Sequence, residues 1–183
     1  MSESDTTIPI PRWAYVPGGE TEPDREPLEQ AKRYVPQRFD GYVPWAHPAL
    51  LYGLTLNDSE LYWESHEVLE AVWKAAPMNG LDRIVLQALI QIANAGLKQR
   101  IGRNAAAGRL VALARELLRE FAVRKGSVAE ESLAARIQSE TIAQQLDRWA
   151  PPTKLYLIPA LFPAEPEQKC RISGEYGWTT HAS

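Results

Sequence analysis

Apolar residues recur every three or four positions through the middle of the chain, which is the spacing of helices that bury one face. The pattern is clearest in an alanine-rich stretch, at Leu110, Leu113, Leu117, Leu118 and Phe121. No alternation of apolar and polar residues, the pattern of a half-buried strand, competes with it. We therefore expect an all-α protein, built as an antiparallel helical bundle of about five helices with short connections.

Start and stop signals divide this region into individual helices. The predicted helices are residues 48–54, 57–75, 81–101, 104–125 and 127–148. Asn57 with Glu60, and Ser127 with Glu130, have the spacing of capping boxes, in which the first side chain bonds a free N–H of the first helical turn. Both pairs are therefore predicted to start helices. The segment from Trp149 to Pro152 is expected to end the last helix, because its two prolines cannot continue it.

Proline and aromatic residues separate two arms from this bundle. Eight of the 14 prolines lie in residues 1–48 and five in residues 151–183, whereas Pro77 alone lies between. The arms also hold ten of the 16 aromatic residues, and Tyr-Val-Pro occurs three times in the first arm. Because disordered segments are poor in aromatic residues, we expect extended arms that are partly docked. The predicted divisions are an arm over 1–46, a bundle domain over 47–150, and an arm with a mobile tail over 151–183.

Composition narrows the class of protein. The net charge is −3, and the single Cys170 has no partner for an intrachain disulfide. No stretch is apolar enough for a membrane span, and the acidic first residues lack the pattern of a signal peptide. We therefore expect a cytoplasmic protein that does not act at a membrane.

The densest chemistry lies between Leu61 and Trp73. At 100° per residue, Leu61, Tyr62, Val68, Leu69 and Val72 form one apolar face of a helix. A neighbouring face carries two tryptophans and three titratable groups, and Glu64 is expected to lie away from it. That neighbouring face consists of Trp63, His66, Glu67, Glu70 and Trp73. Because two tryptophans are unusual on a fully solvated face, we expect this face to be partly covered.

The next predicted helix has a matching polar stripe formed by Gln87, Gln91, Asn94 and Lys98. If the two helices pack antiparallel, the amides can bond His66 and the carboxylates, since buried polar groups need partners. The predicted ligand pocket is therefore lined by Trp63, His66, Glu67, Glu70, Trp73, Gln87, Gln91 and Asn94.

Several functions fit this pocket. His66 and Glu70 stand four residues apart, so both can ligate a divalent metal, with Glu67 as a nearby base. The ligand set is incomplete, because Glu70 occupies the place of the second histidine in the His-Glu-x-x-His pattern of zinc proteases, and the other histidines are His47 and His181. A metal-free pocket that binds a small polar ligand, and a polar network that only fixes helix register, are the alternatives.

The same residues carry a family resemblance. The segment from Tyr62 to Glu70 is its most specific part, followed by Trp73, Leu89 to Ala93, and a group near the start of the next helix. That group consists of Gly102, Asn104, Gly108 and Leu110. Together with Asn57, these residues resemble the small bacterial and archaeal helical proteins of the domain of unknown function 309 family. The resemblance covers residues 57–110 and implies a compact all-α bundle whose His and Glu cluster faces the Gln of the next helix. It implies no activity.

Two further features of the sequence bear on partners of other classes. Residues 98–125 contain eight basic and two acidic side chains, but the arginines scatter around the helix, so a solvated surface partly paired with glutamates is expected and nucleic acid is not an expected partner. Self-association through the aromatic arms is an alternative. The interpretation favoured by the sequence is a non-catalytic scaffold or small-ligand-binding module, with a metal-dependent hydrolase using His66, Glu67 and Glu70 as the alternative.

Overall fold

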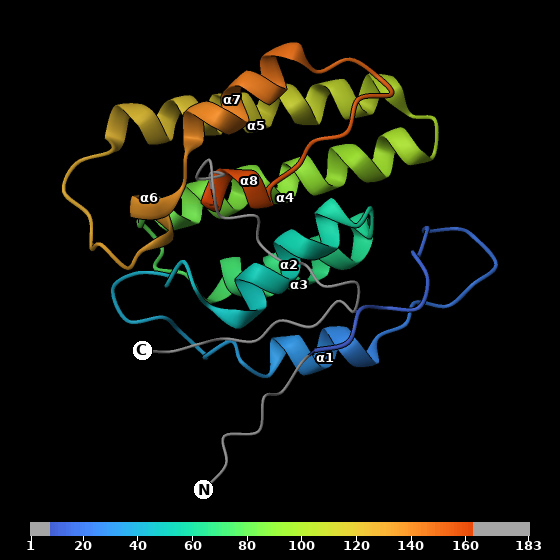
Figure 1. Cartoon of the computed structure of the whole chain (residues 1–183), viewed down its shortest axis with the longest axis horizontal. Coiled ribbons are helices and arrows are strands. Elements are labelled where there is room, and N and C mark those ends of the chain that lie inside the picture. Colours follow the sequence, from blue (N-terminus) through green and yellow to red (C-terminus); the bar gives the residue numbers. More distant parts are fainter. Residues whose placement is uncertain (1–7, 163–183) are drawn as a thin grey trace, which may run out of the picture.

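The computed structural model describes residues 8–162, and these residues form eight helices and no β-strand (Figure 1). The helices are α1 (Glu26–Lys32), α2 (Pro48–Asp58), α3 (Tyr62–Ala75), α4 (Leu81–Arg100), α5 (Asn104–Arg124), α6 (Leu133–Arg136), α7 (Ser139–Arg148) and α8 (Ile158–Leu161). In this part of the chain α2, α3, α4, α5 and α7 have at least 10 residues each. The predicted all-α bundle of about five helices is confirmed.

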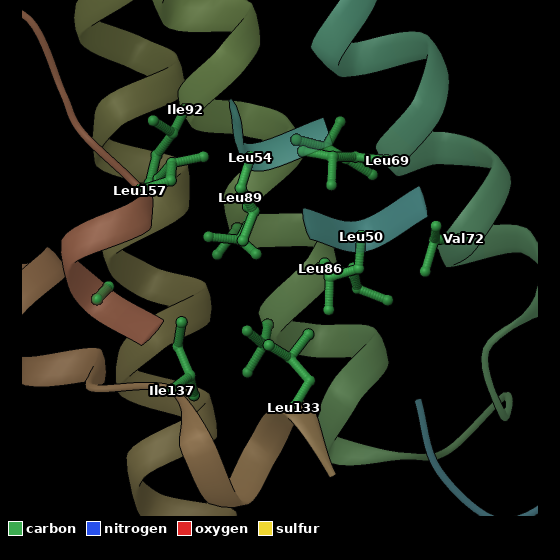
Figure 2. Packing of buried hydrophobic residues seen from close by; sticks show 14 of the residues in the cluster. Leu50, Leu54, Leu69, Val72, Leu86, Leu89, Ile92, Leu133, Ile137 and Leu157 are labelled. Carbon is green, nitrogen blue, oxygen red and sulfur yellow. The ribbon is translucent and has the colours of Figure 1, made fainter. Parts of the chain in front are cut away.

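The 20-residue helix α4 lies at the centre of the bundle. It packs between α3 and α5, while α2 lies beside α3, α7 lies beside α5 and α1 covers the far side of α3 (Figure 1). Leu86, Leu89 and Ile92 of α4 point into a core shared with Leu50 and Leu54 of α2 (Figure 2). Within residues 8–162 no helix has both the length and the apolar character needed to span a bilayer.

Two glycines let α3 approach its neighbours closely. A Cβ atom on Gly53 of α2 would lie 2.7 Å from Cδ2 of Leu69, and one on Gly96 of α4 would lie 2.5 Å from Cε1 of Tyr62. Ser65 Oγ adds a 2.7 Å hydrogen bond to the Gly53 carbonyl. These contacts fix α3 between α2 and α4, so that its remaining face is turned outward.

The predicted capping box at Asn57 is wrong. Helix α2 continues past Leu54 to Asp58, and α3 starts after Leu61 with no side-chain cap. Glu60 has a φ of 64°, and the N–H groups of Glu60 and Leu61 donate to the carbonyls of Asn57 and Leu56. This is a Schellman motif, which ends a helix. The motif usually contains glycine at the left-handed position, and Glu60 therefore gave no signal of it.

The predicted start at Ser127 is also wrong. The predicted fifth helix is two helices, α6 and α7, and Ser132 is the N-cap of α6, where its Oγ accepts from the Ala135 N–H. Leu133 donates its N–H to Val43, and Leu133 and Ile137 are buried in the core (Figure 2). These contacts with the first arm hold the segment in its own conformation. Helix α7 ends at Arg148, as predicted from the following prolines.

The described parts of both arms pack on the bundle. The first arm contains the unpredicted helix α1, where Leu28 and Ala31 are buried, and residues 155–161 of the second arm bury Leu157 and Leu161. The buried arm residues are mostly aliphatic, whereas Trp13 and Tyr34 are each 40% exposed. The mobile tail predicted for the end of the second arm falls on residues 163–183, outside the described residues.

Candidate functional site

The outward face of α3 carries the predicted site. Val68, Leu69 and Val72 are fully buried in the core, which turns the residues between them toward the surface. Trp63, His66, Glu67, Glu70 and Trp73 are all half-buried. The sequence therefore placed these five side chains correctly on one helix face, partly covered.

His66, Glu67 and Glu70 come together as a cluster. Each offers one ligand atom, an imidazole nitrogen or a carboxylate oxygen, and the three atoms lie within 4.8 Å of one another. His66 Nδ1 is buried, and no hydrogen-bond partner for it exists among the residues that the structure describes. The carboxylates keep partial access to solvent, with 26% of the Glu67 side chain and 35% of the Glu70 side chain exposed. The two carboxylates are therefore partly open to solvent, whereas His66 Nδ1 is not.

Two ammonium groups already lie beside these carboxylates. Lys32 Nζ, at the end of α1, is 3.6 Å from Glu67 Oε2. Lys74 Nζ is 3.0 Å from Glu70 Oε2, in an i,i+4 pair on α3 itself. These lysines offset the negative charge that Glu67 and Glu70 bring together.

The first arm and α4 cover the two tryptophans that flank the cluster. The Tyr15 ring meets Trp63 edge-on, with 4.7 Å between ring centroids, and the Arg25 guanidinium lies 5.5 Å from the Trp63 ring. Arg83 of α4 lies 3.9 Å over Trp73, and its Nη1 donates to the Trp73 and Ala76 carbonyls. Each of the two tryptophans therefore has a guanidinium group against its ring.

The predicted amide stripe on α4 makes no hydrogen bond to the cluster in the described part of the chain. Gln87, Gln91 and Asn94 are half-buried. No hydrogen bond links these amides to His66, Glu67 or Glu70 within residues 8–162. Their place in a shared ligand pocket stays a prediction. His47 is used elsewhere, since its Nε2 lies 3.1 Å from the Tyr34 carbonyl oxygen and burial lowers its pKa. His181 falls outside the described residues.

Glu64 is a buried acid that the sequence analysis set aside. Its side chain is completely buried, and Oε1 accepts a 2.6 Å hydrogen bond from the Tyr15 N–H. Oε2 is also buried, and the described part of the chain provides no donor to it. Burial raises the pKa of Glu64. The signal was present, because Glu64 shares an i,i+4 row with the core residues Val68 and Val72.

Three aspartates also hold arm segments and were missed. Asp82 accepts from the N–H groups of Val43 and Ala134, both at 2.7 Å, and Asp58 accepts from Leu157 at 2.7 Å and Ile158 at 2.9 Å. Burial raises the pKa of both carboxyls, and these hydrogen bonds oppose that rise. Asp24 pairs with Arg12, whose hydrogen bonds lower the pKa of Asp24. All three act on backbone or salt-bridge partners and touch no part of the His66 cluster.

A separate small cavity lies between α4 and the start of the second arm. Asn57, Tyr62, Gly96, Gln99 and Trp149 are among the residues that line it. Its volume of about 10 Å³ is enough for one water molecule and too small for a metabolite. This cavity is separate from the cluster of His66, Glu67 and Glu70, none of which lines it.

The basic stretch, residues 98–125, is partly paired with acidic side chains, as predicted. Arg119 and Arg124 form ion pairs with Glu116 and Glu120 on the exposed side of α5. Arg115 pairs with Asp147 of α7 at 2.9 Å. These pairs leave a mixed surface in place of a continuous basic stripe.

Comparison with known proteins gives one match. No curated protein and no solved structure matches the chain. The matched family model covers α4 and nearly all of α2, together with α3 and its polar face. Tyr15, Arg25 and Lys32, which cover that face, lie outside the matched residues. Over residues 50–110 the chain matches the family described as Domain of unknown function (DUF309), which confirms the resemblance carried by its His-Glu-x-x-Glu helix.

Proposed function

We propose that this protein is a non-catalytic helical module that binds a small cation, above all a divalent metal ion, on the outer face of α3. The observation that carries the proposal is the convergence of three ligand atoms, from His66, Glu67 and Glu70, within 4.8 Å of one another. Two carboxylates and one imidazole suit a first-row divalent metal such as Mn²⁺ or Zn²⁺. Protein ligands of this number leave the remaining coordination positions to water.

The two carboxylates of the cluster, and not their cationic neighbours, favour a cation over an anion. Lys32 and Lys74 place ammonium groups at 3.6 Å and 3.0 Å from the carboxylates, and Arg25 and Arg83 lie over the flanking tryptophans. Each carboxylate and each flanking tryptophan therefore already holds one positive group, and an incoming cation must compete with the two ammonium groups for the carboxylates. A buried His66 Nδ1 that lacks a partner within the described residues adds a nitrogen able to accept or donate at the same place.

Metal-dependent hydrolysis is the second candidate. A site with three protein ligands keeps a water on the metal, as catalytic zinc sites do, although those sites have at most one carboxylate where this cluster has two. The non-catalytic function takes precedence because Glu67, the candidate base, is itself one of the three ligand groups and is paired with Lys32. A rate of ester or phosphoester hydrolysis that requires both added metal and Glu67 would replace the first candidate with the second.

Isothermal titration calorimetry with Mn²⁺ and Zn²⁺ tests the proposal. We expect one ion per chain, bound at least tenfold more weakly by Glu70→Gln because one charged ligand is lost. Glu120→Gln is a matched control, since Glu120 forms the same kind of i,i+4 ion pair, with Arg124, on α5. Equal affinities for wild type, Glu70→Gln and Glu120→Gln would contradict binding at this cluster.

A further inference from the structure

Lys32 belongs to a different part of the chain from the cluster that it contacts. It is the last residue of α1, and the buried Leu28 and Ala31 hold this helix against α3. Lys32 follows Leu28 by four residues, so its side chain lies along the same anchored face. As a result Nζ lies 3.6 Å from Glu67 Oε2, and the Lys32 side chain is only 24% exposed.

From this geometry, we propose that Lys32 is a built-in competitor for the cation site. Its ammonium group pairs with the Glu67 carboxylate, which is also a ligand of the incoming metal ion. The inference rests on the proposed function of the same cluster. A metal ion bound to Glu67 brings two positive charges to the carboxylate that Lys32 neutralises. Ion binding therefore displaces the ammonium, and the lost ion pair weakens the affinity for the ion.

Lys74 also pairs with a carboxylate of the cluster, but it is expected to compete with the ion less than Lys32 does. Lys74 lies on α3 itself, four residues after Glu70, and 63% of its side chain is exposed. It can turn into solvent when an ion binds, and an exposed i,i+4 pair contributes little. Lys32 has less room to turn away, because its own helix is held in place and Glu29, 3.2 Å away, is its other carboxylate contact. Removing Lys32 should therefore change affinity more than removing Lys74.

The same arm brings Tyr15 and Arg25 to Trp63. The covering of Trp63 thus comes from residues outside the matched family region, whereas the three ligands, and Arg83 over Trp73, lie inside it. In this chain the first arm sets how readily the cluster accepts a cation. Reciprocity requires that a bound ion in turn frees Lys32.

The test compares the affinities of four proteins for Mn²⁺ by calorimetry: wild type, Lys32→Met, Lys74→Met and Lys32→Arg. Lys32→Met is expected to bind about fivefold more tightly, the effect of losing one partly buried ion pair. Lys74→Met should change affinity less than about twofold on the same scale, and Lys32→Arg should retain the affinity of the wild type. Lys125→Met controls for net charge at a lysine elsewhere on the surface.

Binding by the wild type without tighter binding by Lys32→Met would overturn the inference and leave the proposed function standing. Equal gains in Lys32→Met, Lys74→Met and Lys125→Met would also overturn it, because they would reduce the effect to net charge. If no protein in the series binds the ion, the proposed function itself fails.

A second measurement keeps the inference testable if Lys32→Met is poorly folded. Amine acylation of the wild type, followed by mass spectrometry, reports how accessible each lysine is. Saturating Mn²⁺ should raise the labelling rate of Lys32 severalfold and leave that of Lys125 unchanged. An unchanged rate at Lys32 with the ion bound would overturn the inference.

Discussion

The Oε1 atom of Glu64, on α3, accepts a 2.6 Å hydrogen bond from the backbone N–H of Tyr15, 49 residues earlier in the chain. The same relationship recurs at Asp82, which accepts from Val43, and at Asp58, which accepts from Leu157. In each case a carboxylate on the bundle satisfies a main-chain donor of an arm. The arms are therefore held by specific polar contacts as well as by buried aliphatic side chains.

Glu64 should make stability depend on pH in a recognisable direction. Burial raises the pKa of Glu64 above its ordinary value of 4.5, so the folded protein keeps this proton at pH values where the unfolded chain has lost it. The contribution of Glu64 to the free energy of unfolding therefore falls as pH rises from the unfolded to the folded pKa. Glu64→Gln lacks this proton equilibrium but keeps an acceptor for Tyr15.

Urea unfolding of both proteins at a series of pH values between about 4 and 7 checks this prediction. The free energy of unfolding of Glu64→Gln, minus that of the wild type, should increase with pH and then level off. Subtracting the two proteins removes the opposite effect of Asp24, whose pKa is lowered by Arg12. A difference that is flat or that decreases with pH would show that the Glu64 carboxyl is not buried as described.

Asp82 should be among the most important polar residues for stability. Its two oxygens accept from the N–H groups of Val43 and Ala134, both at 2.7 Å, and only 4% of the residue is exposed. Asp82→Ala leaves two buried donors without an acceptor, which should lower the free energy of unfolding by about 3 kcal/mol. Asp82→Asn should cost most of that amount, because its amide group offers one acceptor for two donors.

Chemical denaturation measures both variants. Glu116→Ala is the control, since Glu116 is a 65% exposed acid whose ion pair with Arg119 lies on the surface of α5, and it should change stability by less than about 0.5 kcal/mol. A wild-type stability for Asp82→Asn would mean that one of the two hydrogen bonds contributes nothing.

Gly96 should be required for the contact between α3 and α4. An added Cβ would lie 2.5 Å from the Tyr62 ring, so Gly96→Ala must push the ring or the helix aside, at a cost of about 2 kcal/mol. Gly108→Ala is the matched control within α5, where the new Cβ would lie 3.7 Å from Trp149. Because alanine favours a helix over glycine, this control should raise stability by about 0.7 kcal/mol.

Thermal unfolding should therefore shift the two glycine variants in opposite directions, with Gly96→Ala melting below and Gly108→Ala above the wild type. If both variants melted above the wild type, helix propensity alone would account for the result. The close approach of Tyr62 to α4 would then be wrong.

The periodicity of apolar residues was enough to predict the long helices α3, α4 and α5 and the polar face of α3, because both depend on spacing within one helix. It failed where the deciding contact is distant in sequence. Asp82 accepts a hydrogen bond from Val43, which is 39 residues away in the sequence, and no local pattern of residues predicts that pair. The turn at Glu60 was missed for a different reason. Glycine usually occupies the left-handed position that ends a helix, so a glutamate there cannot be recognised from the sequence.

The candidate site shows the same division. The meeting of His66, Glu67 and Glu70 follows from helical spacing and was predicted. The approach of Lys32 to Glu67 depends on how the first arm packs on α3. It was not predicted, because α1 lies in the proline-rich arm, where no helix was expected. Glu64 alone could have been found, since its row continues through Val68 and Val72.

The central claim is that the imidazole of His66 and its two neighbouring carboxylates bind a cation. Nitrogen-detected NMR of ¹⁵N-labelled histidine side chains, recorded during a Zn²⁺ titration, tests it most directly. We predict that the ring nitrogens of His66 shift strongly at one equivalent of Zn²⁺, that those of His47 stay in place, and that Glu70→Gln abolishes the shift at that concentration. Unchanged His66 nitrogens in the wild type, or an equal shift in Glu70→Gln, would contradict the proposed site.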